Sequence, residues 1–206
     1  MRTPKTISPA MLLWLFFKPG KAFEVLSNAR PTANAVFFGL VVWLAAIPPV
    51  LAYIGGSRFG WRLGAEEPLF LAQDVLVKIS IGYFIALLFG FVSSAVIAKW
   101  MATTYGARLS LGIHYALMTI VGAPLVVGST IHLYPHVFIN IMVLVPALIW
   151  SMYLLYKGLP IVLRISPERG MLMASSLIAY LLVAAVSLLG VTVALWSHGF
   201  GPAVGI

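Results

Sequence analysis

The sequence predicts an all-α integral membrane protein, a bundle of five transmembrane helices preceded by a short amphipathic N-terminal interfacial helix. Five apolar stretches each approach the roughly 20 residues needed to cross about 30 Å of hydrocarbon. Hydrophobic residues make up 62% of the chain and charged residues only 9%, whereas soluble domains carry about 25% charged residues. The stretches and their short connections take up most of the 206 residues, so we expect no separate soluble domain.

The first segment, residues 1–30, is predicted to lie at the cytoplasmic membrane interface. Its apolar run, residues 11–17, is too short to span, and it ends in Lys18–Gly20 rather than in the small-residue pattern of a cleaved signal. We therefore expect the segment to be retained. Apolar residues beside Lys18 and Lys21 suit a helix in the headgroup zone that continues over Ala22–Asn28. A loosely ordered basic tail is the alternative.

The spans follow within residues 31–198, the predicted transmembrane domain, and residues 199–206 form a short tail on the outer side. We expect the five spans at Ala33–Ile54, Val75–Ala98, Leu111–Leu133, Val137–Tyr156 and Met171–Trp196. The last helix should begin earlier, near Pro167, because Ser166, Pro167 and Glu168 supply an N-cap, a first-turn proline and an early acid.

Lysine and arginine residues are distributed unevenly among the connections. Ten lie before the first span or in the second and fourth connections, two lie in the first connection, and Lys78 lies within span two. The positive-inside rule therefore predicts a cytoplasmic N-terminus and an external C-terminus. The formal net charge of +8 indicates this topology and contact with anionic lipids at the cytoplasmic face. Basic and aromatic residues do not alternate as in RNA-binding sheets, so we expect no nucleic-acid partner.

Span two carries small residues at every fourth position. Because the bilayer supplies no hydrophobic drive between helices, small residues at this spacing let helix backbones approach closely. We therefore predict that this stripe is a helix-packing seam and that span two lies at the centre of the bundle. The stripe consists of Gly82, Ala86, Gly90, Ser94 and Ala98.

The same helix carries Asp74 and Lys78, an acid-to-base pair at i, i+4. A charge inside a span indicates a functional site by default, because an uncompensated charge in lipid is costly. Two interpretations stay open. The residues form an interfacial ion pair that positions the helix, since Lys78 is close enough to the interface to snorkel, or they begin a polar path for a substrate or a proton.

Asn140 and His114 are the other candidate functional polar residues. Asn140 is one of few polar side chains predicted within a span, and His114 lies near the cytoplasmic end of span three, where a satisfied interfacial histidine is the simpler interpretation. On the predicted outer side, His132, His136 and His198 invite a metal or proton-sensing interpretation. Pro135 breaks the helical spacing of the first two, so we expect polar residues at a wet interface and no metal.

Particular segments of the chain, in their order, resemble the bacterial branch of the Yip family of membrane proteins. They are LFFKP at 15–19, YIGGSRFGW at 53–61, YP at 134–135, YLLYKGLP at 153–160 and RISPERG at 164–170, followed by a last span that ends in LW at 195–196. The resemblance implies five membrane helices, a cytoplasmic N-terminus and residence in the bacterial inner membrane. Eukaryotic members are associated with Rab-type GTPases, but their Asp-Leu-Tyr-Gly-Pro signature has no match here.

The leading functional hypothesis is a non-enzymatic, multi-pass inner-membrane protein that acts in membrane organisation or through lipid or protein contacts. No Walker loop, HExxH pattern or Ser, His and acid arrangement occurs, and cysteine is absent. We therefore expect no catalytic residue, metal or cofactor. The partners are expected to be the bilayer and either a second copy of the chain or another membrane protein. A small transporter or an oligomeric channel is the alternative.

Overall fold

The computed structural model describes residues 14–62, 64 and 67–199. A π-helical segment, η1 (Phe37–Val41), joins the short helix α3 to α4, and a 3-10 helix, η2 (Ser129–Leu133), follows α6. In these residues there are two isolated β-bridges and no β-strand. The helices are α2 (Pro19–Asn28), α3 (Ala33–Val36), α4 (Val42–Phe59), α5 (Gln73–Thr104), α6 (Leu111–Gly128), α7 (Val137–Leu163) and α8 (Pro167–Ser197).

The predicted fold class is confirmed, because five helical stretches are long and apolar enough to cross a membrane. Each contains its predicted span, and α8 begins at Pro167, as the sequence indicates. The Ser166 hydroxyl caps α8 by accepting a hydrogen bond from the Arg169 amide (3.5 Å). The stretches are Ala33–Phe59, Gln73–Thr104, Leu111–Leu133, Val137–Leu163 and Pro167–Ser197.

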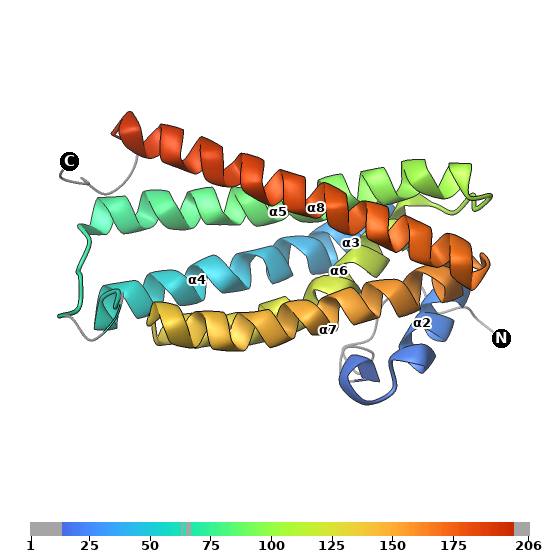
Figure 1. The fold of residues 1–206 in the computed structure, drawn as a ribbon, viewed down its shortest axis with the longest axis horizontal. Helices are drawn as coiled ribbons and strands as arrows, with labels where there is room; N and C mark the ends of the chain where they lie inside the picture. Colours follow the sequence, from blue (N-terminus) through green and yellow to red (C-terminus); the bar gives the residue numbers. More distant parts are fainter. Residues whose placement is uncertain (1–13, 63, 65–66, 200–206) are drawn as a thin grey trace.

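The spans run alongside one another and the chain reverses at each connection (Figure 1). One end of the bundle carries α2 together with the connections 105–110 and 164–166, and we call it the α2 end. The other end carries the described residues of the α4–α5 connection (60–62, 64 and 67–72), the connection 134–136 and the C-terminus of α8, and we call it the opposite end. Residues 1–13 and 200–206, which belong to the predicted interfacial segment and outer tail, lie outside the described residues.

Helix α6, rather than the predicted second span, occupies the centre of the bundle. Within the most apolar 18 residues of each span, 61% are buried inside the protein for Leu111–Leu133 but only 6% for Gln73–Thr104. Every residue from Gly112 to Ile120 is buried, and α6 contacts α5, α7, α4 and α3. Hydropathy could not distinguish these helices, because an apolar side chain suits lipid and a protein core equally well.

The small-residue stripe of α5 is only partly a packing seam. Ser94 and Ala98 are buried, but Gly82 is exposed, and a Cβ atom added to Gly82 or Gly90 would meet no atom within 4 Å. Ala86, between them, is half-buried. The predicted seam is therefore wrong for its first half, because α5 packs tightly against its neighbours toward the α2 end and leaves these glycines uncovered.

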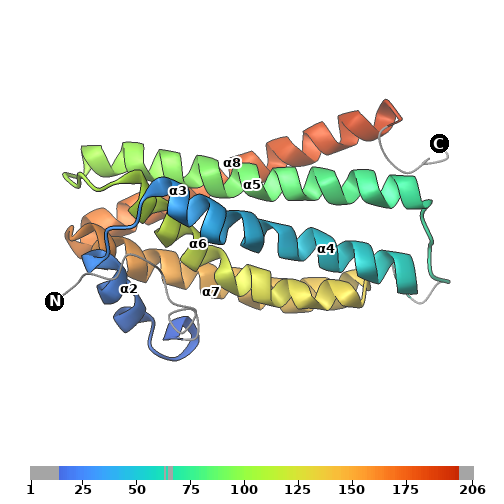
Figure 2. The ribbon, with the colours of Figure 1, turned by 180° about the vertical axis from the view of Figure 1, so that it is seen from behind.

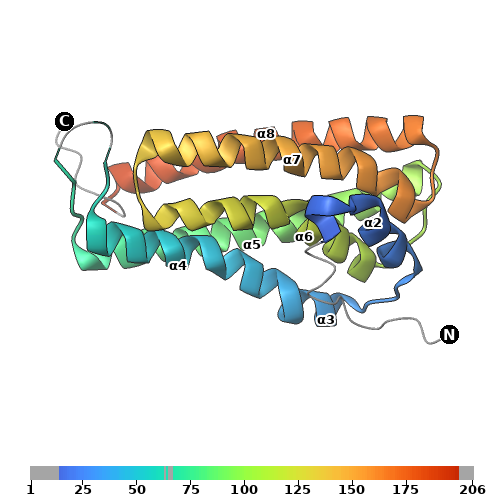
Figure 3. The same ribbon diagram turned by 90° about the horizontal axis from the view of Figure 1, so that it is seen from below.

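The predicted amphipathic helix is present as α2, but its apolar face packs on protein. Ala22, Phe23 and Leu26 are fully buried, and α2 contacts α7 and α6 (Figures 2 and 3). The Phe23 ring fills the notch at Gly158, where an added Cβ would lie 2.6 Å from the ring. Arg164, at the end of α7, donates hydrogen bonds to the Ser27 carbonyl (3.2 Å) and to Asn28 Oδ1 (2.7 Å). These contacts join α2 to the bundle.

Helix α8 is anchored only at its beginning. Met173, Ala174 and Leu177 are fully buried, whereas no residue from Ile178 to Ser197 is buried. Figures 1 and 2 show the C-terminal half of α8 rising away from α5. Apolar side chains cover this half, which suits a surface that lipid solvates.

Candidate functional site

The connection between α4 and α5 is held in place by backbone hydrogen bonds at the opposite end. Gly60 has a φ of +67°, a left-handed conformation that glycine adopts without strain. Beyond it, the amides and carbonyls of Trp61 and Leu69 pair with each other (2.8 Å each). Arg62 bonds through its backbone to Pro135 (2.9 Å) and Val137 (3.0 Å) at the turn before α7. Trp61 is thereby fixed over the end of the bundle.

Two adjacent glycines of α4 allow this arrangement to close. A Cβ on Gly55 would lie 2.0 Å from the His132 carbonyl oxygen, so only glycine lets α4 meet the backbone of η2. A Cβ on Gly56 would lie 2.7 Å from Trp61 Nε1. The two glycines of the segment YIGGSRFGW therefore allow η2 and the Trp61 indole to pack directly against α4.

A hydrogen-bonded chain joins three helical elements beneath this connection. Asn140 of α7 donates through Nδ2 to the carbonyls of Tyr134 (3.1 Å) and His136 (2.9 Å), which turns its Oδ1 toward His132 Nδ1 (2.5 Å). Because an amide oxygen only accepts, His132 Nδ1 carries the proton. His132 Nε2 then accepts from the Tyr83 hydroxyl of α5 (3.3 Å). The chain is satisfied with a neutral imidazole.

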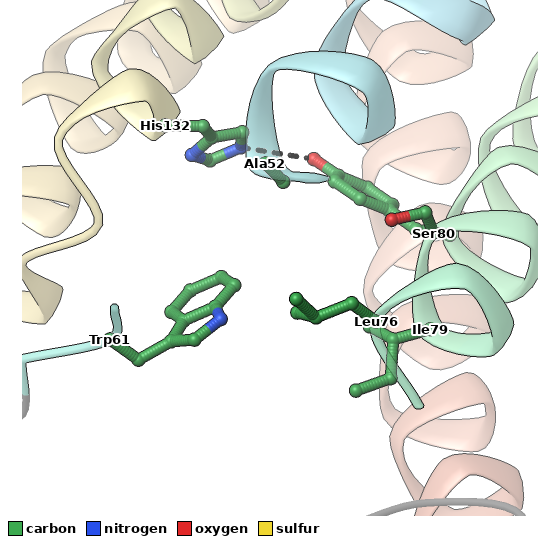
Figure 4. Close-up of a pocket in the computed structure, with 7 residues that line it drawn as sticks. Ala52, Trp61, Leu76, Ile79, Ser80 and His132 are labelled. Carbon is green, nitrogen blue, oxygen red and sulfur yellow. Dashed lines mark hydrogen bonds between the residues drawn. The ribbon is translucent and has the colours of Figure 1, made fainter. Parts of the chain in front are cut away.

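A cavity of about 210 Å³ lies beside this chain (Figure 4). Its lining is mostly apolar, with the Tyr83–His132 hydrogen bond on one side and the Trp61 indole facing Leu76 and Ile79 across the space. Trp61 Nε1 is buried and has no hydrogen-bond partner. The lining residues are Ala52, Trp61, Leu76, Ile79, Ser80, Tyr83 and His132.

A second hollow of about 420 Å³ lies between α4 and α5, and it shares Ser80 with the first. Its lining is almost wholly apolar and includes the exposed side chains of Val50, Val77 and Ile81. We call it the α4–α5 groove. It is lined by Ala46, Pro49, Val50, Tyr53, Val77, Ser80, Ile81 and Phe84.

Of the four candidate polar residues that the sequence indicates, only one lies beside the cavity at the opposite end. Asn140 belongs to the hydrogen-bonded chain. Asp74 and Lys78 form an ion pair (3.2 Å) on an exposed face of α5, with 66% and 53% of their side chains accessible, and neither lines a cavity described above. His114 is fully buried in α6; its Nδ1 bonds the Ser110 carbonyl (2.9 Å), and its Nε2 has no partner.

The outer histidines do not converge on one point. His132 is bound by Tyr83 and Asn140, His136 stacks on Tyr134 with ring centroids 6.2 Å apart, and His198 Nδ1 bonds the Ala194 carbonyl (2.7 Å) at the end of α8. In the part of the chain that the structure describes, no group of three His, Cys, Asp or Glu side chains is placed to hold a metal ion.

The α2 end carries most of the positive charge. Eight described cations belong to it, against two carboxylates, Glu24 and Glu168. Lys157 approaches the first turn of α2, where its Cε lies 3.9 Å from a Cβ placed on Gly20, and its Nζ bonds the Tyr153 hydroxyl (2.9 Å). Lys18 and Lys21 are exposed beside it. The eight are Lys18, Lys21, Arg30, Lys99, Arg108, Lys157, Arg164 and Arg169.

Sequence reasoning missed that Trp61 lines the cavity at the opposite end and that Tyr83 and His132 are hydrogen-bonded to each other there. Trp61 looks like an interfacial aromatic, and nothing in the spacing of Tyr83, His132 and Asn140 shows that three separate helical elements bring them together. The usable signal was the paired glycine of YIGGSRFGW, since adjacent glycines in a helix indicate close approach by another backbone.

These features define a class of protein, a small multi-pass α-helical membrane protein with a polar cluster at one end and a basic surface at the other. A family model for the Yip1 domain matches residues 14–188. The protein called inner membrane protein YohC is 31% identical over 186 residues, which cover 90% of this chain and 95% of the relative. The match has the same values in Escherichia coli strain K12 and in Escherichia coli O6:H1 strain CFT073.

The chain belongs to the Yip family, and it is a multi-pass protein of the bacterial inner membrane. No solved structure matches it. The predicted membership is confirmed, and the segments that carried the resemblance now have structural roles. In YLLYKGLP and RISPERG, for example, the Pro160 ring packs where a Cβ on Gly170 would stand, 2.8 Å away, and so closes the turn between α7 and α8.

Proposed function

We propose that this protein is a non-enzymatic membrane organiser that binds anionic phospholipid headgroups at its α2 end, on the cytoplasmic side. The observation that carries the proposal is the unbalanced charge of this end. The one ion pair in the described part of the chain, Asp74–Lys78, belongs to the other half of α5. Basic residues beside an anionic leaflet contribute about 1 kcal/mol each to lipid attraction.

The cations at the α2 end divide into two groups by their contacts. Arg30 and Arg164 are used within the protein, because they donate to carbonyl oxygens at the end of α2. Lys18, Lys21 and Lys157 instead surround the first turn of α2, whose amides lack a capping side chain. Amides at a helix N-terminus and lysine ammonium groups both favour a phosphate. This group is the proposed headgroup contact.

The packing of the bundle favours this role over the alternative of a small transporter. A transport path needs polar or irregular structure that lines a cavity inside the membrane. In the middle of α6, by contrast, Ala116, Leu117 and Ile120 are fully buried, and the Thr119 hydroxyl bonds the Tyr115 carbonyl of its own helix (2.6 Å). A protein that acts through its surface contacts with lipid needs no such transport path through its core.

Native mass spectrometry of the purified full chain tests the proposal, with phosphatidylglycerol and phosphatidylcholine offered in equal amounts. We expect the protein to retain phosphatidylglycerol preferentially and the triple variant Lys18→Gln, Lys21→Gln, Lys157→Gln to lose the preference. The matched control Arg58→Gln, Arg62→Gln, Lys78→Gln removes the same charge from the opposite half and should keep it. An equal preference in both triple variants would overturn the proposal.

A further inference from the structure

We propose that the cavity at the opposite end and the α4–α5 groove together form a binding site for a single-chain lipid with an uncharged, hydroxyl-bearing head, such as a monoacylglycerol. The chain lies in the groove and the head enters the cavity at Ser80. This site shares no residue with the proposed anionic-lipid contact at the α2 end.

The first argument is an unsatisfied donor. The Trp61 indole N–H is buried at the cavity without an acceptor, and leaving a buried donor unpaired is unfavourable. Gly56 leaves room for the indole to occupy this position, and the Trp61–Leu69 backbone pair holds it there. An oxygen atom in the cavity would accept this hydrogen bond.

The second argument concerns the opposite wall and requires that the head also donates. Because the Tyr83 hydroxyl donates its hydrogen bond to His132 Nε2, the Tyr83 oxygen remains free to accept a hydrogen bond from a ligand. Ser80 lies on the same side of the pocket in Figure 4, and its hydroxyl can donate or accept. A hydroxyl group meets both requirements, because it can accept from Trp61 and donate to Tyr83.

The third argument is the absence of charge. None of the residues that line the cavity or the groove is Asp, Glu, Lys or Arg, and both ring nitrogens of His132 already have hydrogen-bond partners in Asn140 and Tyr83. A charged head would lose its hydration here without gaining a counter-charge, which is strongly unfavourable. The ligand head is therefore uncharged, in contrast to the phosphate proposed at the α2 end.

The fourth argument is size and continuity. The cavity alone, about 210 Å³, holds no more than a headgroup or roughly seven waters at about 30 Å³ each. The groove adds about 420 Å³ on the side where α4 and α5 present exposed apolar residues, within the roughly 300–1,000 Å³ typical of ligand pockets. Ser80 borders both spaces, so one amphiphile can occupy them together.

Photolabelling of the full chain in phosphatidylcholine vesicles tests the site, with a monoacylglycerol that carries a diazirine in its acyl chain as the probe. Labelled peptides should concentrate at residues 46–53 and 77–84 over the exposed half of α8, and unlabelled monoacylglycerol should compete. Trp61→Phe keeps an aromatic ring at this position and removes the donor, so the competitor concentration needed for half-displacement should rise about twofold to tenfold.

Ser80→Leu should abolish the competed labelling, because the larger side chain blocks the junction, whereas Ser93→Leu, on the same helix but outside the groove, should leave it unchanged. Even, uncompeted labelling of all exposed helices would overturn the proposal and leave water as the cavity's occupant. Displacement by phosphatidylglycerol as strong as by monoacylglycerol would overturn the uncharged head. Neither result bears on the lysines of the α2 end.

Discussion

At the scale of single residues, glycine positions decide how closely the helices of this protein approach. Gly55, Gly112 and Gly158 each stand where an added Cβ would overlap a neighbouring backbone or ring, whereas Gly82 and Gly90 face open space. The spacing of small residues could predict that α5 has a smooth surface, but not whether protein or lipid covers it. The small residues of α5 do form a stripe. Its second half packs against other helices as predicted, but its first half, at Gly82, is not covered by protein.

Gly55→Ala should destabilise the protein, and Gly82→Ala should not. The new methyl group at position 55 would meet the His132 carbonyl oxygen, and overpacking of this kind costs about 1–3 kcal/mol. At position 82 the methyl group meets nothing, and alanine is favoured over glycine in a helix by up to about 1 kcal/mol. The thermal midpoint in detergent measures both changes. Equal midpoints for the two variants would contradict the α4–η2 contact.

At the scale of elements, the sequence could predict that a helix follows Lys18 but not what covers its apolar face. Local spacing identifies an amphipathic helix, and a headgroup layer and a protein groove require the same pattern. The deciding partners are distant in sequence, Gly158 and Arg164 on α7. The same limit explains why Asn140 was recognised as a polar residue while its chain to His132 and Tyr83 was not.

Arg164 should control how firmly α2 is docked. It has a φ of +54° at the end of α7, and its guanidinium joins the last carbonyls of α2. Asparagine tolerates this backbone conformation but cannot reach α2, so Arg164→Asn removes the contact with little added strain. We expect amide hydrogen exchange in residues 22–28 to accelerate by about threefold to tenfold, the loss expected for a partly exposed hydrogen bond.

The control for this measurement is Arg169→Asn. Arg169 also lies at the α7–α8 turn, but its guanidinium bonds the Tyr105 carbonyl (3.5 Å) rather than α2. Exchange in residues 22–28 should therefore stay at the wild-type rate in this variant. If Arg164→Asn also left the exchange unchanged, the burial of Phe23 and Leu26 alone would hold α2 in place, and Arg164 would be only a helix cap.

At the scale of the whole molecule, composition and hydropathy could predict the solvent, the number of spans and their order. The lengths of five apolar stretches are set by the bilayer, so they can be counted without knowledge of any contact. The central position of α6 could not be predicted from the count and order of the spans, because the same kinds of apolar side chain face lipid and fill a protein core. Orientation rests on charge alone.

The chain should sit with its α2 end in the cytoplasm, because ten of its thirteen lysine and arginine residues precede span one or lie in the second and fourth connections. The absence of cysteine makes this directly measurable, since a single introduced thiol is the only site for a maleimide. Thr103 marks the α2 end and Ser57 the opposite end, and both are exposed.

In spheroplasts, a membrane-impermeant maleimide should label Ser57→Cys at once and Thr103→Cys only after permeabilisation. Labelling of Thr103→Cys alone would reverse the orientation and place the proposed anionic-lipid contact on the wrong leaflet, while immediate labelling of both would show that the charge difference does not fix one orientation.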